Sequence, residues 1–133
     1  MAAVLISACG SDGGAGGGSS PESGDAAVTV PNDAQDLRGR RVVEIRVVDN
    51  EFEPSVFRVD PGAEIVFENR GRNPHNVTPA DEGSFEGIPT EDLQPGKRAS
   101  MSISDEGVYR YYCTLHGTPD RGQNGVIIVG DVS

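Results

Sequence analysis

The pattern of apolar and polar residues along most of the chain is that of β-strands. Apolar Val43, Ile45 and Val47 alternate with charged residues, so every second side chain of this segment would face a core. Gly, Pro and Asp separate further short apolar runs, at residues 56–59, 64–68, 101–103, 109–112 and 126–129. This spacing predicts about seven short strands, no convincing helix, and an all-β antiparallel sandwich.

The first 38 residues lack this pattern. Residues 1–9 are apolar and end in Ile-Ser-Ala-Cys, which resembles the lipobox of a truncated bacterial lipoprotein signal peptide, with Cys9 as the lipidated residue. This segment is too short to span a bilayer. Residues 10–38 are rich in Gly and Ser, which predicts a flexible linker with a reach of roughly 30 Å. We therefore expect one folded domain at residues 39–133.

The charge balance and the absence of common catalytic motifs exclude several functions. The chain has 21 acidic and 11 basic residues, a net charge of -10, which disfavours binding to phosphate backbones. The sequence contains no nucleophile elbow, no phosphate-binding loop before a helix, and no calcium-loop spacing among the carboxylates of residues 81–92. We therefore expect neither a nucleic-acid-binding protein nor an enzyme.

A thiol and an imidazole lie where a predicted strand becomes a loop, at Cys113 and His116. This pair alone is compatible with zinc, copper, a cysteine nucleophile or no function. The remaining histidine, His75, directly follows another predicted strand. Two imidazoles and one thiolate from two loops suit a copper electron-transfer site with a weak axial fourth group, whereas structural zinc needs a fourth strong ligand.

These segments resemble the cupredoxins, or blue copper proteins, most closely the small plastocyanin-like members. The resemblance covers roughly residues 41–132, and its specific parts are residues 74–77 and 111–119. It implies a Greek-key β-sandwich that binds one copper ion, Cu(II) or Cu(I). The ligands implied are His75, Cys113 and His116. The axial Met of the family would fall about ten residues after the Cys, where this chain has Gln123.

The resemblance also implies roles for residues around the ligands. Asn76 would donate its backbone N–H to the Cys113 sulfur and would bond Thr114 through its side chain. The carbonyl of Pro74 would face the copper from the side opposite Gln123. Such outer contacts fix the orientation of metal ligands and tune the metal.

The function expected is that of a type 1 copper protein that carries single electrons between redox partners. It would act as a monomer outside the cytoplasmic membrane, anchored by a lipid on Cys9, with the ring edge of His116 as the electron port. The acidic charge favours partners with a basic docking surface. Two alternatives remain, an extracytoplasmic copper carrier and a metal-free β-sandwich interaction module. Two histidines cannot provide the second copper centre of a multicopper oxidase or nitrite reductase.

Overall fold

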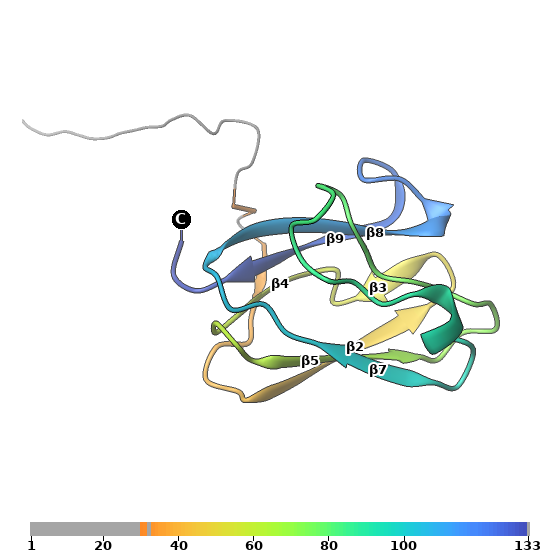
Figure 1. Ribbon diagram of the computed structural model, residues 1–133, viewed down its shortest axis with the longest axis horizontal. Helices are drawn as coiled ribbons and strands as arrows, with labels where there is room; N and C mark the ends of the chain where they lie inside the picture. Colours follow the sequence, from red (N-terminus) through yellow and green to blue (C-terminus); the bar gives the residue numbers. More distant parts are fainter. Residues whose placement is uncertain (1–29, 32, 133) are drawn as a thin grey trace, which may run out of the picture.

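The computed structural model describes residues 30–31 and 33–132, which form a sandwich of two β-sheets (Figure 1). The strand order is β1-β4-β9-β8-β6 in one sheet and β3-β2-β5-β7 in the other. The strands are β1 (Gln35–Asp36), β2 (Val42–Val48), β3 (Glu51–Glu53), β4 (Val56–Val59), β5 (Glu64–Asn69), β6 (Thr78–Pro79), β7 (Arg98–Met101), β8 (Gly107–Gly117) and β9 (Gly122–Val129). The predicted all-β sandwich is therefore confirmed.

The described residues contain nine strands, where the sequence pattern predicts about seven, and one short helix. The strands β1 and β6 have two residues each and β3 has three, too few for an alternating pattern to be recognised. The helix, η2 (Thr90–Asp92), is a single 3-10 turn before β7. Within the described ranges, no helix has the length and apolar character needed to cross a membrane.

The sheets are mixed rather than purely antiparallel. Strand β5 pairs with β2 in parallel, and β4 pairs in parallel with both β1 and β9. The reason is that the chain crosses between the sheets, because β4 lies in the first sheet while β3 and β5 lie in the second. The alternating pattern correctly indicates which side chains face the core, but it carries no information on which strands become neighbours.

Tyr111 of β8 lies at the centre of the core. Its ring centroid is 4.8 Å from that of Phe52, 6.0 Å from Phe67 and 6.4 Å from Phe57. Its hydroxyl donates a 2.8 Å hydrogen bond to the backbone oxygen of Ser55, and burial raises the pKa of Tyr111 well above the ordinary tyrosine value. These rings come from both sheets. The cluster therefore joins the two sheets at the middle of β8.

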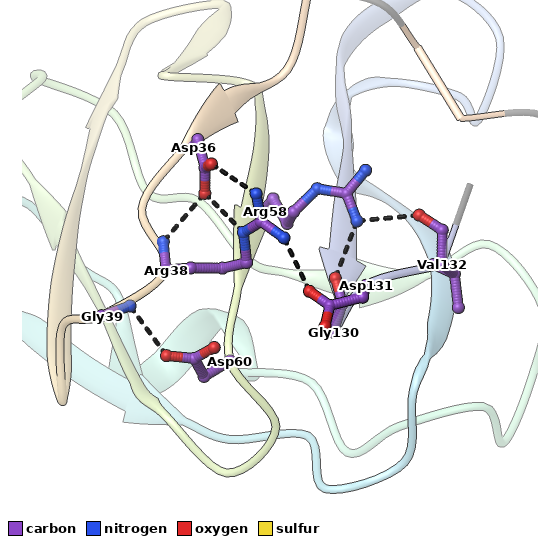
Figure 2. Close-up of polar contacts among 8 residues, drawn as sticks. All are labelled: Asp36, Arg38, Gly39, Arg58, Asp60, Gly130, Asp131 and Val132. Carbon is purple, nitrogen blue, oxygen red and sulfur yellow. Dashed lines mark hydrogen bonds and ion pairs between the residues drawn. The ribbon is translucent and has the colours of Figure 1, made fainter.

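Charged residues join the start of the folded part to its end (Figure 2). The Arg38 guanidinium donates hydrogen bonds of 2.6 Å to Asp36 and 2.6 Å to Asp131. Arg58 donates to two backbone carbonyl oxygens just after β9. We call these four residues, Asp36, Arg38, Arg58 and Asp131, the terminal clamp. The eight residues of β9, about 26 Å of extended chain, separate the clamp from the beginning of that strand. The clamp therefore lies at the opposite end of the sandwich from the beginning of β9.

The folded part begins earlier than the sequence predicts. Gln35–Asp36 forms β1 and pairs with β4, and Leu37 is buried. The predicted boundary after residue 38 therefore lies inside the folded part, because a two-residue strand and one buried Leu do not stand out in a polar segment. The predicted lipidation site Cys9 and residues 10–29 of the predicted linker lie outside the described residues.

Candidate metal centre

Three side chains with metal-binding atoms meet at one end of the sandwich, which we call the metal pole. The Cys113 sulfur lies 3.7 Å from His75 Nδ1 and 3.7 Å from His116 Nδ1. The donor atoms of all three residues lie within 4.8 Å of one another. Bonds of about 2.0 to 2.3 Å to a shared ion hold nitrogen and sulfur donors at such spacings. The structure thus brings together the three residues that the sequence predicts as ligands.

An irregular strand pairing turns Cys113 and His116 toward one site. Strand β8 pairs regularly with β9 as far as Tyr112, and the pairing resumes only at Gly117. Four residues of β8 therefore face a single residue of β9, Gln123. Residues three apart in a regular strand point to opposite faces, so the bulge is what allows Cys113 and His116 to face the same site.

Gln123 is fully buried at the metal pole and has one unpaired polar atom. Its Nε2 donates two hydrogen bonds of 3.0 Å, to the backbone oxygens of Val48 and Glu51. Both amide hydrogens are therefore used by the β2–β3 hairpin. The Oε1 atom has no hydrogen-bond partner in the described part of the chain.

The donor set fits a copper ion. A buried oxygen acceptor without a donor is rare in native structures, and a bound ion is one of its ordinary explanations. Here that oxygen belongs to the residue at the position of the family's axial ligand, beside one thiol and two imidazoles. Copper accepts such a mixture of soft sulfur and imidazole nitrogen with a weak fourth ligand.

Asn76 connects the two loops that carry the candidate ligands. Its Nδ2 donates hydrogen bonds to Oγ1 of Thr114, at 2.8 Å, and of Thr90, at 3.0 Å. Its Oδ1 accepts from the backbone N–H of Thr114, at 3.0 Å, and from the hydroxyl of Thr78, at 2.9 Å. The side-chain bond between Asn76 and Thr114 that the resemblance implies is present. Asn76 therefore holds the residue after His75 against the residue after Cys113.

One other expected contact of this kind is not found. The Cys113 sulfur accepts no hydrogen bond from the backbone N–H of Asn76 among the described residues, where the two imidazole nitrogens are its polar neighbours. Pro74 is half-buried immediately before His75. The orientation of its carbonyl toward a copper ion stays a prediction.

His75 is completely buried, and an acid lies beside it. Burial lowers the pKa of His75, and the charge of His116 lowers it further. The Nε2 atom of His75 lies 3.6 Å from Oδ1 of Asp49, a residue whose side chain is 39% exposed. A role for Asp49 is not predicted from the sequence. Its one signal is the Asp49-Asn50 pair between two strands, which is typical of a tight hairpin turn.

His116 differs from His75 in exposure. It is half-buried, and the neighbouring Leu115 has 51% of its surface exposed. The ring of His116 lies 4.7 Å from that of His75, centroid to centroid. One imidazole of the pair is therefore enclosed, and the other reaches the protein surface.

Comparisons with known proteins place this geometry in a family. The family described as Cupredoxin-like domain matches residues 26–129. Plastocyanin from Lactuca sativa is 38% identical over 74 residues, which are 49% of this chain and 75% of that protein. Plastocyanin from Solanum crispum is 36% identical over the same shares of the two chains.

Solved structures support the same fold. A purple cupredoxin from Nitrosopumilus maritimus superposes with a TM-score of 0.55 and 24% identity, over 66% of this chain and 99% of that one. A copper-containing nitrite reductase from Thermus scotoductus gives a TM-score of 0.56 over 86% of this chain but only 28% of the larger protein. With the clustered His75, Cys113 and His116, the cofactor is a single copper ion. The chain belongs to the cupredoxin-like domain family, as a plastocyanin-like member.

Proposed function

We propose that this protein is a type 1 copper protein that carries single electrons between protein partners. The observation that carries the proposal is the convergence of the donor atoms of His75, Cys113 and His116 within 4.8 Å of one another, with both Nδ1 atoms 3.7 Å from the Cys113 sulfur. Gln123 Oε1, buried and unpaired among the described residues, is the proposed axial donor. The three plastocyanin-type donors and the sequence similarity to plastocyanins support electron carriage over other uses of this fold.

The surrounding residues favour electron carriage because they hold the donors in place. Bound copper supplies a one-electron change between Cu(II) and Cu(I). The two hydrogen bonds of Gln123 Nε2 and the four of Asn76 keep the donor atoms in one arrangement. A site with thiolate and imidazole donors that need not move accommodates both oxidation states, so the reorganisation that slows electron exchange is small.

His116 is the proposed port through which electrons leave and enter. Its imidazole is half-buried beside exposed Leu115, while His75 is fully enclosed. The net charge of -10 favours partners with a basic docking surface. Electrostatic steering of this kind weakens with ionic strength, so we expect the electron-transfer rate with such a partner to fall as salt is added.

A visible spectrum of the copper-loaded protein tests the proposal. We expect an intense band at about 600 nm from the thiolate-to-copper transition of a His₂Cys site. Cys113→Ser should abolish the band, whereas the matched variant Cys9→Ser, which changes the only other cysteine of the chain, should retain it. A colourless complex, or a band that survives Cys113→Ser, would remove the proposed ligand set.

Retention of copper separates an electron carrier from a copper carrier. We expect repeated reduction and oxidation in the presence of a Cu(I) chelator to leave the band intensity unchanged, because the donors are buried or held by neighbours. Loss of the metal to the chelator within the first cycle would favour copper delivery instead.

We also propose that the domain works outside the cytoplasmic membrane, held by a lipid on Cys9. This proposal rests on the lipobox-like sequence at residues 6–9. Stable anchoring requires more than one acyl chain, so the native protein should carry at least two and should partition with membranes. Mass spectrometry that finds an unmodified residue at Cys9 would contradict the proposal.

A further inference from the structure

We propose that Asp49 is the residue that positions His75, by holding the imidazole proton on Nε2 and placing a negative charge behind the metal site. The inference rests on the assignment of His75 as a copper ligand through Nδ1. A ligating imidazole nitrogen must be free of its proton, so the proton must lie on the other ring nitrogen. Which nitrogen carries the proton is set by the acceptor that faces the other one.

Asp49 is the acceptor that the structure offers to this proton. His75 Nε2 is buried and has no hydrogen-bond partner within the described part of the chain. The Oδ1 atom of Asp49 lies 3.6 Å away, slightly beyond the length of a hydrogen bond. Metal binding at Nδ1 makes the Nε2–H group a stronger donor. A movement of about half an ångström would then complete the bond.

The carboxylate is held in place by the loop that carries His75. Its Oδ1 accepts a 3.1 Å hydrogen bond from the backbone N–H of Arg72, which is the first cause of a lowered pKa of Asp49. A Cβ atom at Gly71 would lie 2.5 Å from the same oxygen, so this close approach requires a glycine. The next residue, Asn50, has a φ of 74°, which closes the tight turn between β2 and β3.

The same hairpin holds the proposed axial donor. The backbone oxygens of Val48 and Glu51, on either side of the turn, accept both hydrogen bonds of Gln123 Nε2. One two-residue turn therefore sets the tautomer of His75 and the orientation of the Gln123 amide. This shared support explains why an exposed acid at a hairpin tip bears on a buried metal site.

The charge of Asp49 should affect the copper potential. A carboxylate partner makes a ligating imidazole more basic, which stabilises Cu(II) more than Cu(I). Loss of such outer partners typically weakens metal binding by about 10- to 100-fold. We expect Asp49→Asn to weaken Cu(II) binding about tenfold relative to Cu(I), which is a rise in potential of about 59 mV for a one-electron couple.

Three variants test the proposal with two independent readouts. Asp49→Asn removes the charge but keeps an acceptor oxygen, and Asp49→Ala removes both. Asp120→Asn removes the same charge from the exposed loop between His116 and Gln123, where Asp120 contacts Arg110 and not a proposed ligand. The readouts are NMR of the His75 ring nitrogens in the copper-free full chain and voltammetry of the copper-loaded chain.

In the copper-free wild type and in Asp49→Asn, we expect the proton of His75 on Nε2, and in Asp49→Ala a mixture of the two tautomers. The potential should rise in Asp49→Asn by clearly more than in Asp120→Asn. An Nδ1–H tautomer in the wild type, an unchanged tautomer in Asp49→Ala, or equal potentials in the two Asn variants would overturn the proposal. The NMR result needs no copper, so a failure of the proposed function stays distinguishable from a failure of this inference.

Discussion

The two ends of the sandwich hold their polar groups in opposite ways. At the metal pole, His75, Asn76 and Gln123 are buried, and His75 Nε2 and Gln123 Oε1 lack hydrogen-bond partners among the described residues. At the terminal clamp, the side chains of Asp36, Arg38 and Asp131 are more than a third exposed and closely paired. Arg38 there contacts Asp36 and Asp131 at 2.6 Å each. Strand β9 is common to both ends, because Gln123 lies near its beginning and Asp131 follows its end.

This difference distinguishes a ligand-binding site, at the metal pole, from contacts that only hold the two ends of the folded chain together, at the terminal clamp. A buried polar atom left unpaired costs about 1 to 3 kcal/mol, so an unpaired Gln123 Oε1 beside the three donor side chains indicates a ligand that offsets the cost. Exposed ion pairs contribute little to stability because water solvates the separated charges nearly as well. We therefore expect perturbations of the metal pole to have large effects that depend on copper. Perturbations of the clamp should have small effects that do not.

Copper itself should produce the largest effect. Because the ion binds the folded chain, at a free concentration a thousandfold above its Kd it should stabilise the fold by about 4 kcal/mol. We expect thermal unfolding of the full chain to shift upward on copper loading and to return on removal with a chelator. Cys113→Ser should lose most of this shift. Equal melting temperatures with and without copper in the wild type would contradict the distinction between the two ends.

Loss of the Asn76 side chain should produce the next largest effect. Asn76→Ala removes four part-buried hydrogen bonds, two of which join the ligand loops. At a net contribution of about 0.5 to 1 kcal/mol each, we expect a loss of about 2 to 4 kcal/mol in the copper-free protein. Denaturant unfolding measures it. Asn124→Ala removes one exposed hydrogen bond, to the backbone oxygen of Thr118, and serves as the control. A loss no larger than that of the control would show that the loops are held by other contacts.

Gln123→Met should change the potential more than the stability. A thioether is a softer donor than an amide oxygen, so the variant should favour Cu(I) and have a higher potential. The variant also loses the hydrogen bonds to Val48 and Glu51, for which we expect a loss of about 1 to 3 kcal/mol. Asn124→Met, one residue along β9, should leave the potential unchanged. Voltammetry that shows an unchanged or lower potential for Gln123→Met would mean that Gln123 is not the axial ligand.

The sequence predicts the all-β sandwich and the clustering of His75, Cys113 and His116, and for the same reason. Alternation is a local signal, and two imidazoles with one thiol, the donor set that suits a copper electron-transfer site, are recognisable by residue type. The parallel pairing of β2 with β5 and of β4 with β9 is not predictable in this way. This pairing depends on where the chain crosses between the sheets, and a crossing produces no periodic pattern in the sequence.

The roles of Asp49 and of the terminal clamp could not be predicted, because they depend on contacts with residues far away in the sequence. Asp49 is one of 21 acidic residues, and only the fold places it 3.6 Å from His75 Nε2. Arg38 pairs with Asp131 across 93 positions of the chain, and many other acids were available to it. Any of many acidic residues could pair with a given arginine, so the residue type does not identify the pair. A rare thiol or imidazole is identified by its residue type.

The smallest effect should follow Arg38→Ala, which opens the terminal clamp. Exposed ion pairs are weak, so the melting temperature should fall by less than about 4 °C. The visible band and the potential should not change, because the clamp lies at the opposite end from the copper site. Arg40→Ala is the matched control, since no ion pair of Arg40 is found in the described part of the chain. A shift in potential would show that the two ends are coupled.

The pH dependence of the difference in melting temperature between wild type and Arg38→Ala shows whether the charge of Arg38 causes that difference. Hydrogen bonds from Arg38 lower the pKa of Asp36 below the ordinary value of 3.8. A carboxyl whose pKa is lowered on folding stabilises the fold above its unfolded pKa, and this contribution is lost as the pH falls toward the folded pKa. The difference in melting temperature between wild type and Arg38→Ala should therefore be full at neutral pH and should shrink below pH 3.8. Calorimetry at several pH values measures it, and a difference independent of pH would attribute it to the packing of the arginine stem rather than to its charge.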